Sequence, residues 1–300
     1  MLINQPITRV WQKWRFSAPQ THLWLIKVWL SASTFLVKIA TFTKPENVMH
    51  KLMKTAATLI ILTLVLTALT LKTDFLSEQK KFVKVRTAFK EKEKLIEQKL
   101  NEIGLKPDNF NILIAIYKDS DEFEIYAKKK TETNYSFLNS YKICSRSGKL
   151  GPKRKQGDYQ VPEGFYKIDQ FNPTSNYYLS LGVNYPNQAD RKKSKATDLG
   201  GAIFIHGACV TIGCVPMTDE KIKEIYIYAV LAKNNGQSNI PVYIFPFKMT
   251  DQNFSSYKEK YKENKVLLGF WANLKTGYDR FLKEKKELKI IVESNGDYKF

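Results

Sequence analysis

The sequence predicts an α+β protein, in which a β-rich domain packs with flanking helices and follows an apolar N-terminal segment. Short runs rich in β-branched and aromatic residues, such as NILIAIY and IPVYIFPF, are typical of strands. Runs that interleave lysines and glutamates with apolar residues, such as KEKEKLIEQK, are typical of solvated helices. A hydrophobic content of 43% over 300 residues is enough for a core, shared by one large domain or two small ones.

The apolar segment, residues 55–71, predicts export. It reads TAATLIILTLVLTALTL, carries no charge and lies between Lys54 and Lys72. As a helix it would span roughly 25 Å, slightly under the roughly 30 Å hydrocarbon core of a bilayer. The segment is longer than the apolar region of a typical signal peptide, and no A-x-A cleavage site follows it, which favours an uncleaved anchor over a cleaved signal. We therefore expect a periplasmic protein held at or near the inner membrane, whose partner through 55–71 is the cytoplasmic membrane.

Residues 1–54 are interpreted as an N-terminal extension or as the product of a start codon assigned too early. The short basic stretch MHKLMK, just before the apolar segment, looks like the beginning of a signal sequence. Either interpretation leaves the folded part of the protein to the residues that follow.

The exported part is expected to begin with a helical lead-in, residues 72–105. Lys80 to Gly104 places apolar residues roughly on one side of a helix. A β-rich domain, which holds the candidate chemistry described below, is expected over 106–250. It begins with two strands that flank Asp119–Asp121 as a hairpin.

Turns and strands alternate through the middle of this domain. Glycines and prolines punctuate SGKLGPKRKQGDYQVPEGFY, and strands are expected in YYLSLGVNY and GAIFIHG. Thr218 predicts the N-cap of a helix that runs to about Asn235, where Gly236 ends it. A strand in IPVYIFPF follows, and a C-terminal helical segment over 251–300 is expected to pack on the domain, mostly helical from Tyr257 to Leu288.

The formal net charge of +19 comes mainly from lysines spread along the chain. Such a distribution favours anionic surroundings, such as a membrane surface or a wall polymer. The sequence has no basic-aromatic motif of a known nucleic-acid reader, so no nucleic-acid partner is expected.

The stretch FIHGACVTIGCVPMTD, residues 204–219, carries the candidate chemistry. His206 is the only histidine after the apolar segment, and Cys209 and Cys214 are two of the three cysteines in the chain. About 3% of a free thiol is thiolate at pH 7, and cysteine nucleophiles gain activity from a histidine within about 3 Å. IFIHG predicts a strand that ends at His206, and TIGC predicts a tight turn that returns Cys214 to it. Gly213 would let the backbone approach a carbonyl whose oxyanion accepts N–H groups near Cys214.

The competing interpretation is structural: a histidine with satisfied hydrogen bonds at a strand end, beside two buried cysteines. A zinc site is not expected, because His206, Cys209 and Cys214 leave the fourth ligand to distant Cys144 or a carboxylate with no standard spacing. No metal and no cofactor are predicted.

The motif IHGACVTIGCVPMTD resembles the catalytic motif of the L,D-transpeptidase family with the YkuD-type domain, in its YafK-like branch. CSRSGKLGPKRKQGDYQVPEGFY, NPTSNYYLSLGVNYPNQADR, TDEKIKEIY, FPFKM and FWANLKTGYDRF also look like that branch, and they occur in its order. The resemblance covers roughly Lys80 to Phe281.

The resemblance implies a β-sandwich-like fold that acts on diaminopimelate-containing stem peptides of peptidoglycan, in cell-wall biogenesis and cell shape. It implies that Cys214 is the nucleophile, that His206 is the general base and then acid, and that Gly213 belongs to the oxyanion turn. Thr211 matches the Ser/Thr of the motif and is a candidate substrate-binding residue. An amine acceptor would give a cross-link or an attached wall protein, and water would give hydrolysis. L,D-hydrolase or amidase activity and a silent wall-binding scaffold stay open, as does the oligomeric state.

Two departures from the commoner family motif bear on the substrate. Ile212 stands where that motif has a second histidine, and Pro216 stands where it has an arginine two residues after the cysteine. The resemblance places that arginine near the substrate, so this chain is expected to differ in substrate or acceptor.

Cys144 and Cys209 are candidates for a disulfide, because three thiols cannot all pair and the periplasm is oxidising. Unpaired buried cysteines are the alternative, and a Cys209–Cys214 bond would instead switch the nucleophile off. Lys153 is a candidate for holding a stem-peptide carboxylate, together with Lys149 and Arg154, against the alternative of solvated loop charges.

Two further residues are candidates near the site. Tyr185 is expected either to line the cleft or to belong to the core. Asp198 is a candidate for orienting the imidazole of His206, with a backbone carbonyl as the alternative.

Overall fold

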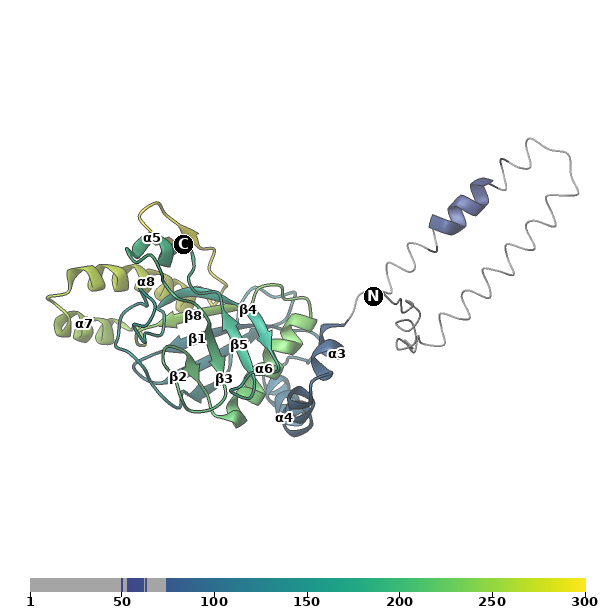
Figure 1. The fold of residues 1–300 in the computed structure, drawn as a ribbon, viewed down its shortest axis with the longest axis horizontal. Helices are drawn as coiled ribbons and strands as arrows, with labels where there is room; N and C mark the ends of the chain where they lie inside the picture. The colour runs from purple at the N-terminus through teal and green to yellow at the C-terminus, as the bar shows by residue number, and fades with distance from the viewer. Residues whose placement is uncertain (1–49, 51–52, 62, 64–73) are drawn as a thin grey trace, which may run out of the picture. The chain divides into compact units, whose positions relative to one another are not determined.

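The computed structural model describes residues 50, 53–61, 63 and 74–300 (Figure 1). Residues 53–61 are helical. Within these described ranges, no helix combines the length and the apolar character needed to cross a bilayer. Part of the predicted signal or anchor over 55–71, and nearly all of the extension over 1–54, lie outside the described residues. Both therefore remain predictions.

Eight strands within residues 74–300 form one mixed sheet, in the order β3-β2-β1-β8-β4-β5-β6-β7. Their bounds are β1 (Asn111–Tyr117), β2 (Glu122–Lys128), β3 (Ser136–Lys142), β4 (Gly164–Asn172), β5 (Ser180–Val183), β6 (Ile203–His206), β7 (Val215–Pro216) and β8 (Pro241–Phe245). A separate pair consists of β9 (Ile291–Val292) and β10 (Tyr298–Lys299). The predicted hairpin is β1 and β2, which pair antiparallel from Asn111↔Lys128 to Tyr117↔Glu122.

Strand β4 joins the two halves of the sheet, and this replaces the implied sandwich with a single continuous sheet. Its first half, Gly164–Lys167, pairs with β8, and its second half pairs with β5. A register irregularity between Ile168 and Gln170 separates the two halves. Such bulges bend the strand that carries them. The two halves are therefore continuous through β4 and form one curled sheet.

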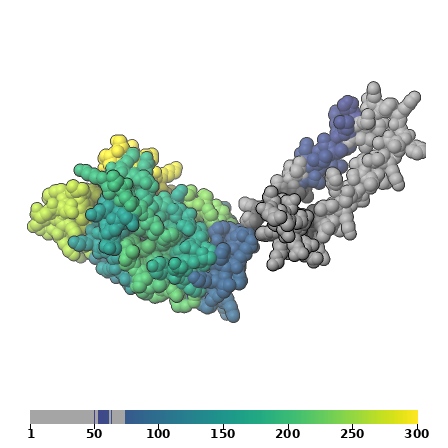
Figure 2. Space-filling model, in the orientation of Figure 1, coloured from purple at the N-terminus to yellow at the C-terminus, as the bar shows by residue number. Residues whose placement is uncertain are grey.

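Helices cover both faces of the sheet. Alternation along β1 directs Ile112, Ile114 and Ile116 into a core with α4 (Val83–Glu102) and α6 (Asp219–Asn234). The intervening residues of β1 enter a second core with α8 (Lys265–Glu284). The short helices are α3 (Phe75–Lys80), α5 (Gln188–Lys193) and α7 (Asp251–Lys260). Figure 2 shows α7 and the adjoining part of α8 as a yellow-green lobe on the surface of this unit.

The predicted helices are confirmed with changes at their ends. Thr218 accepts a hydrogen bond from the Lys221 amide as the N-cap of α6, and the helix ends one residue before Asn235. The predicted lead-in helix is two helices, because the chain turns at residues 81–82. The predicted helix from Tyr257 to Leu288 is also two, since the Asn264 side chain caps a new helix at Leu267 N. The second of these ends at Glu284.

Candidate active site

Strands β6 and β7 bring His206 and Cys214 to neighbouring positions. The two strands are parallel, with Ile205 opposite Val215 and His206 opposite Pro216. Cys214 directly precedes β7, so it lies two rungs of the ladder from His206. Standard strand spacing then separates their Cα atoms by about 8 Å. The structure thus ends a strand at His206, as the sequence predicts, and places Cys214 on the neighbouring segment beside Phe204, where it makes no hydrogen bond to the imidazole.

Thr211 builds the turn that delivers Cys214. Its hydroxyl accepts hydrogen bonds from the amides of Gly213 (3.2 Å) and Cys214 (2.8 Å), and donates to the Cys214 carbonyl (2.9 Å). Gly213 has a φ of +136°, and a β-carbon there would lie 3.2 Å from the Gln160 carbonyl oxygen. The positive φ favours glycine, and any side chain there would also press against the Gln160 carbonyl. The amides of Gly213 and Cys214 are therefore both held by Thr211, which acts here as a turn-forming residue.

The thiol of Cys214 is partly buried against β6. Its sulfur lies 3.4 Å from the Phe204 amide, which donates to it, and 3.6 Å from the Ala202 carbonyl oxygen. Burial raises the pKa of the thiol above its ordinary value, against the opposing effects of the Phe204 amide and the Lys153 charge. No hydrogen bond joins the thiol to His206, two residues that the structure describes in full. In this arrangement the sulfur is a neutral thiol near pH 7.

The imidazole of His206 is buried, with only 2% of its surface exposed. Its Nδ1 lies 2.5 Å from the Gly207 carbonyl oxygen, which fixes the tautomer with hydrogen on Nδ1 and leaves Nε2 as the basic nitrogen. Burial lowers the pKa of His206, and the Gly207 carbonyl opposes that effect. A backbone carbonyl therefore orients the ring. Asp198, the other candidate for this role, instead accepts a hydrogen bond from the Gly200 amide.

Tyr177, which the sequence did not single out, covers the imidazole. The two ring centroids are 4.7 Å apart, with 33° between the ring planes. Tyr177 precedes β5, the strand that pairs with β6 through Ser180↔His206. Only the pairing of β5 with β6 reveals this contact, and no local pattern in the sequence marks it.

A disulfide joins Cys144 to Cys209, with their Cα atoms 5.5 Å apart. Cys214 is consequently the one free cysteine of the three. Cys144 also donates its backbone amide to the Pro216 carbonyl at 3.1 Å. The bridge therefore ties the segment after β3 to the loop between His206 and Cys214.

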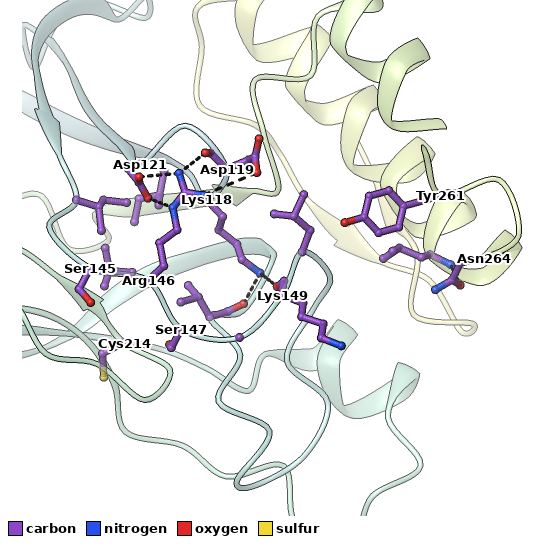
Figure 3. A pocket seen from close by; sticks show the side chains of 17 residues that line it. Lys118, Asp119, Asp121, Ser145, Arg146, Ser147, Lys149, Cys214, Tyr261 and Asn264 are labelled. Carbon is purple, nitrogen blue, oxygen red and sulfur yellow. Dashed lines mark hydrogen bonds and ion pairs between the residues drawn. The ribbon is translucent and has the colours of Figure 1, made fainter. Parts of the chain in front are cut away.

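A cavity of about 460 Å³ has Cys214 in its wall (Figure 3). Ser145, Arg146 and Ser147 lie on the same side as Cys214, and Tyr261 and Asn264 come from the junction of α7 and α8 across from them. The Ser147 hydroxyl is buried with no hydrogen-bond partner among the described residues. A bound ligand would therefore satisfy a polar group that the protein leaves unpaired.

Charged side chains of both signs line this cavity. Arg146 pairs with both carboxylate oxygens of Asp121 and donates to the Asp119 carbonyl oxygen. Its Nη1 lies 3.9 Å from a carboxylate oxygen of Asp119, in a longer ion pair, and 54% of the Arg146 side chain is exposed. Lys149 also lines the cavity and is exposed. The cleft thus presents cationic N–H groups beside carboxylates.

Lys153 and Tyr185 lie together but are buried. The Lys153 ammonium pairs with Asp158 at 2.6 Å and lies 5.9 Å from the centre of the Tyr185 ring. The Tyr185 hydroxyl donates to the Leu199 carbonyl. Arg154 pairs with Asp190. These contacts favour a structural role for Lys153 and Tyr185 rather than contact with a substrate. Lys149 is the lysine that lines the cavity and is exposed.

Metal-ligating residues do not gather at this site. Within residues 74–300 and the described positions before them, no three His, Cys, Asp or Glu side chains are placed to hold a metal ion.

The model of the YkuD family, described as the L,D-transpeptidase catalytic domain, matches residues 114–244. The chain belongs to this family, whose members act on the cell wall. It is 40% identical over 190 residues to "Putative L,D-transpeptidase YafK" of Escherichia coli strain K12, covering 62% of this chain and 72% of that protein. The protein of the same name from E. coli O157:H7 matches to the same extent.

Solved structures with lower similarity were also found. The helical cell shape determining protein Pgp2 from Campylobacter jejuni is 16% identical, with a TM-score of 0.38, over 65% of this chain and 80% of that one. Bd1075 from Bdellovibrio bacteriovorus is 21% identical, with a TM-score of 0.33, over 57% and 62%.

Proposed function

We propose that this protein is a cysteine acyltransferase that modifies peptidoglycan, with Cys214 as nucleophile and His206 as base and then acid. The observation that carries the proposal is the position of the one free thiol. It lies in the wall of the cavity, two ladder rungs from a histidine whose Nε2 is left basic. Membership of the L,D-transpeptidase family supplies the substrate class, the stem peptide of peptidoglycan.

In the first half-reaction, the Cys214 thiol turns away from the Ala202 carbonyl and gives its proton to Nε2 of His206. The sulfur attacks the carbonyl carbon of a diaminopimelate residue in the stem peptide, forming a tetrahedral oxyanion. The carbon–nitrogen bond then breaks, and the leaving amine departs with the proton from His206. The product is a thioester on Cys214.

In the second half-reaction, an amine attacks the thioester and passes a proton through His206 to the departing sulfur. The new amide is a cross-link or an attached wall protein. Water in place of the amine gives hydrolysis by the same residues. The residues of the site do not distinguish transfer to an amine from hydrolysis by water, so the experiment below must distinguish them.

The oxyanion would form next to the Gly213 and Cys214 amides. Both donate to the Thr211 hydroxyl in the structure. An oxyanion is a stronger acceptor than a neutral hydroxyl, so we expect it to take over the Cys214 amide as it forms. Thr211 would then preorganise this amide rather than contact the substrate.

The cavity charges suit a zwitterionic substrate end, such as the free amine and carboxylate of diaminopimelate. Pro216 occupies the position of the usual family arginine and supplies no charge. Arg146 and Lys149, which line the same cavity, would provide the cationic groups. Asp119 and Asp121 lie in the same cavity and would face the ammonium.

Such a substrate lies outside the cytoplasm, so we propose an exported, periplasmic protein. Residues 55–71 would serve as its signal or its anchor in the inner membrane.

The test is to incubate the full chain, in mild detergent, with purified muropeptides and with intact sacculi, and to analyse the products by mass spectrometry. Cys214→Ala and His206→Gln are run in parallel, with Tyr159→Leu as a control that changes an exposed side chain outside the proposed machinery. New diaminopimelate-linked dimers or exchanged terminal residues identify a transferase. Shortened stems, opened cross-links or released wall protein identify a hydrolase. If wild type and Cys214→Ala give the same products on every substrate, the proposal fails and a wall-binding scaffold replaces it.

A further inference from the structure

The imidazole of His206 has no carboxylate partner, although it must carry a positive charge during the proposed reaction. Its Nδ1 contacts a neutral backbone carbonyl, that of Gly207, and the ring is almost completely buried. Burial disfavours the charged form of a histidine. Some other group must therefore compensate for burial when the ring accepts the proton of the thiol.

Tyr177 is the group whose position fits this need. Its ring centroid lies 4.7 Å from that of the imidazole, within the roughly 6 Å range in which an aromatic face attracts a cation. The tilt of 33° between the planes keeps the tyrosine face toward the imidazole. Yet 47% of Tyr177 is exposed, so its position is not explained by burial in the core.

The backbone around Tyr177 holds this arrangement. The Tyr177 amide donates to the Ser175 hydroxyl at 3.1 Å, and the Gly207 amide donates to the Leu179 carbonyl at 3.2 Å. A β-carbon at Gly207 would lie 2.8 Å from the Tyr177 carbonyl oxygen, so only glycine allows this approach. The segment that carries Tyr177 and the residue that orients His206 are thus packed directly against each other.

The other ionisable groups near the imidazole have different partners. Asp219 at the start of α6 accepts the Ala208 amide at 2.9 Å. Tyr178 lies under the ammonium groups of Lys223 and Lys84, from α6 and α4. Cys214 faces Phe204 and Ala202. None of these supplies a negative charge in contact with the ring.

We propose that Tyr177 is a positioning residue for His206, whose ring face holds the imidazole and stabilises its protonated form as Cys214 is activated. The proposal rests on the proposed function, because it assigns Tyr177 to the proton transfer of that reaction. The face of the ring carries the effect, and the hydroxyl does not.

The first measurement is the protonation equilibrium of His206 in the full chain, with isotope-labelled histidine followed by NMR as a function of pH. Loss of one signal in His206→Gln identifies the resonance. Tyr177→Leu keeps an apolar cover but removes the π face, and should shift the equilibrium about 2- to 30-fold toward the neutral ring. Tyr177→Phe should match wild type, as should Tyr159→Leu, the same substitution at an exposed tyrosine without imidazole contact.

The second measurement compares wall-modifying activity with thiol reactivity. Tyr177→Leu should lower kcat near neutral pH by about the same 2- to 30-fold. Its rate of alkylation by iodoacetamide at pH 10 should equal that of wild type, since the thiolate forms there without the imidazole. Equal alkylation also shows that the variant is folded around Cys214.

Two results would overturn the proposal. One is an unchanged or more readily protonated His206 in Tyr177→Leu, since burial would then outweigh the ring face. The other is a loss of activity in Tyr177→Phe equal to that in Tyr177→Leu, which would assign the effect to the hydroxyl. If His206→Gln retains full activity, the proposed function itself is wrong. That result is distinct from the two results on Tyr177→Leu and Tyr177→Phe, which overturn only the role of Tyr177.

Discussion

At the scale of single residues, the candidate site holds its two reactive groups in their neutral forms. Burial raises the pKa of Cys214 and lowers the pKa of His206, so neither shift favours a resting thiolate–imidazolium pair. Papain-type enzymes lower the thiol pKa instead. Proton transfer here is expected to accompany substrate binding rather than precede it.

The pH dependence of thiol reactivity tests this directly. Because burial raises the pKa of Cys214 above its ordinary value of about 9, the iodoacetamide rate should still rise steadily with pH between pH 7.5 and 9. Wall-modifying activity should fall as pH decreases below about 6.5, since protonation through the lowered pKa of His206 removes the base. Stopped alkylation followed by intact-mass measurement gives the first profile, with Cys214→Ala as the unreactive control. A plateau in the rate by pH 8 would contradict this assignment.

At the scale of elements, a buried ion pair positions the wall of the cleft. Lys118, just after β1, pairs at 2.9 Å with Glu163, just before β4, and both side chains are almost fully buried. Lys118 also donates to the carbonyls of Lys149, Gly151 and Val161, while Glu163 accepts from Trp271 of α8. This cluster therefore connects the sheet, the cleft segment and the C-terminal helix.

Glu163→Ala should lower the free energy of unfolding by about 3–5 kcal/mol, because it leaves the Lys118 charge buried without its partner. Urea unfolding measures the loss. Glu259→Ala is the matched control, since it removes a carboxylate from an exposed pair with Lys262 and should cost less than about 1 kcal/mol. Equal losses in the two variants would show that the buried cluster is not a structural anchor.

At the scale of the whole molecule, the disulfide links parts of the chain that lie 65 residues apart in sequence. Cys144 follows β3, at one edge of the sheet, and Cys209 lies in the loop between β6 and β7, at the other. The curl of the sheet is what brings its two edge strands close enough for a bond. The bridge therefore constrains the curled sheet as well as the loop between His206 and Cys214.

Replacing both Cys144 and Cys209 with alanine should lower the free energy of unfolding by about 4 kcal/mol, the value for a closed loop of this length. Thermal unfolding with and without dithiothreitol measures the effect. Reductant should lower the Tm of wild type and leave that of the double variant unchanged. A wild-type Tm that is insensitive to reductant would mean that the bridge contributes little to stability.

Local signals in the sequence predicted the hairpin of β1 and β2, the N-cap at Thr218 and the placement of His206 and Cys214. Each of these depends on neighbours within about ten residues. Strand β4 begins at Gly164 in a turn-rich stretch, and its partner β8 comes some 75 residues later, so no local pattern marks it as central. The single curled sheet therefore could not be predicted.

The roles of the supporting residues also needed the fold. Tyr177 reaches His206 only because β5 pairs with β6, and Tyr261 enters the cleft only through the turn between α7 and α8. Lys153 looks like a solvated or substrate-binding cation in the sequence. Its burial beside Asp158 and Tyr185 arises from packing between segments that are distant along the chain.

The pairing of the cysteines has a consequence for how the protein matures. Under the proposed export, the chain is delivered from its N-terminus, so Cys144 emerges first, Cys209 second and Cys214 last. The bridge joins the two cysteines that are consecutive in this order. An oxidase that pairs thiols as they emerge would make the native bond without rearrangement. Cys214 would then reach the oxidising compartment after Cys144 and Cys209 had already paired with each other.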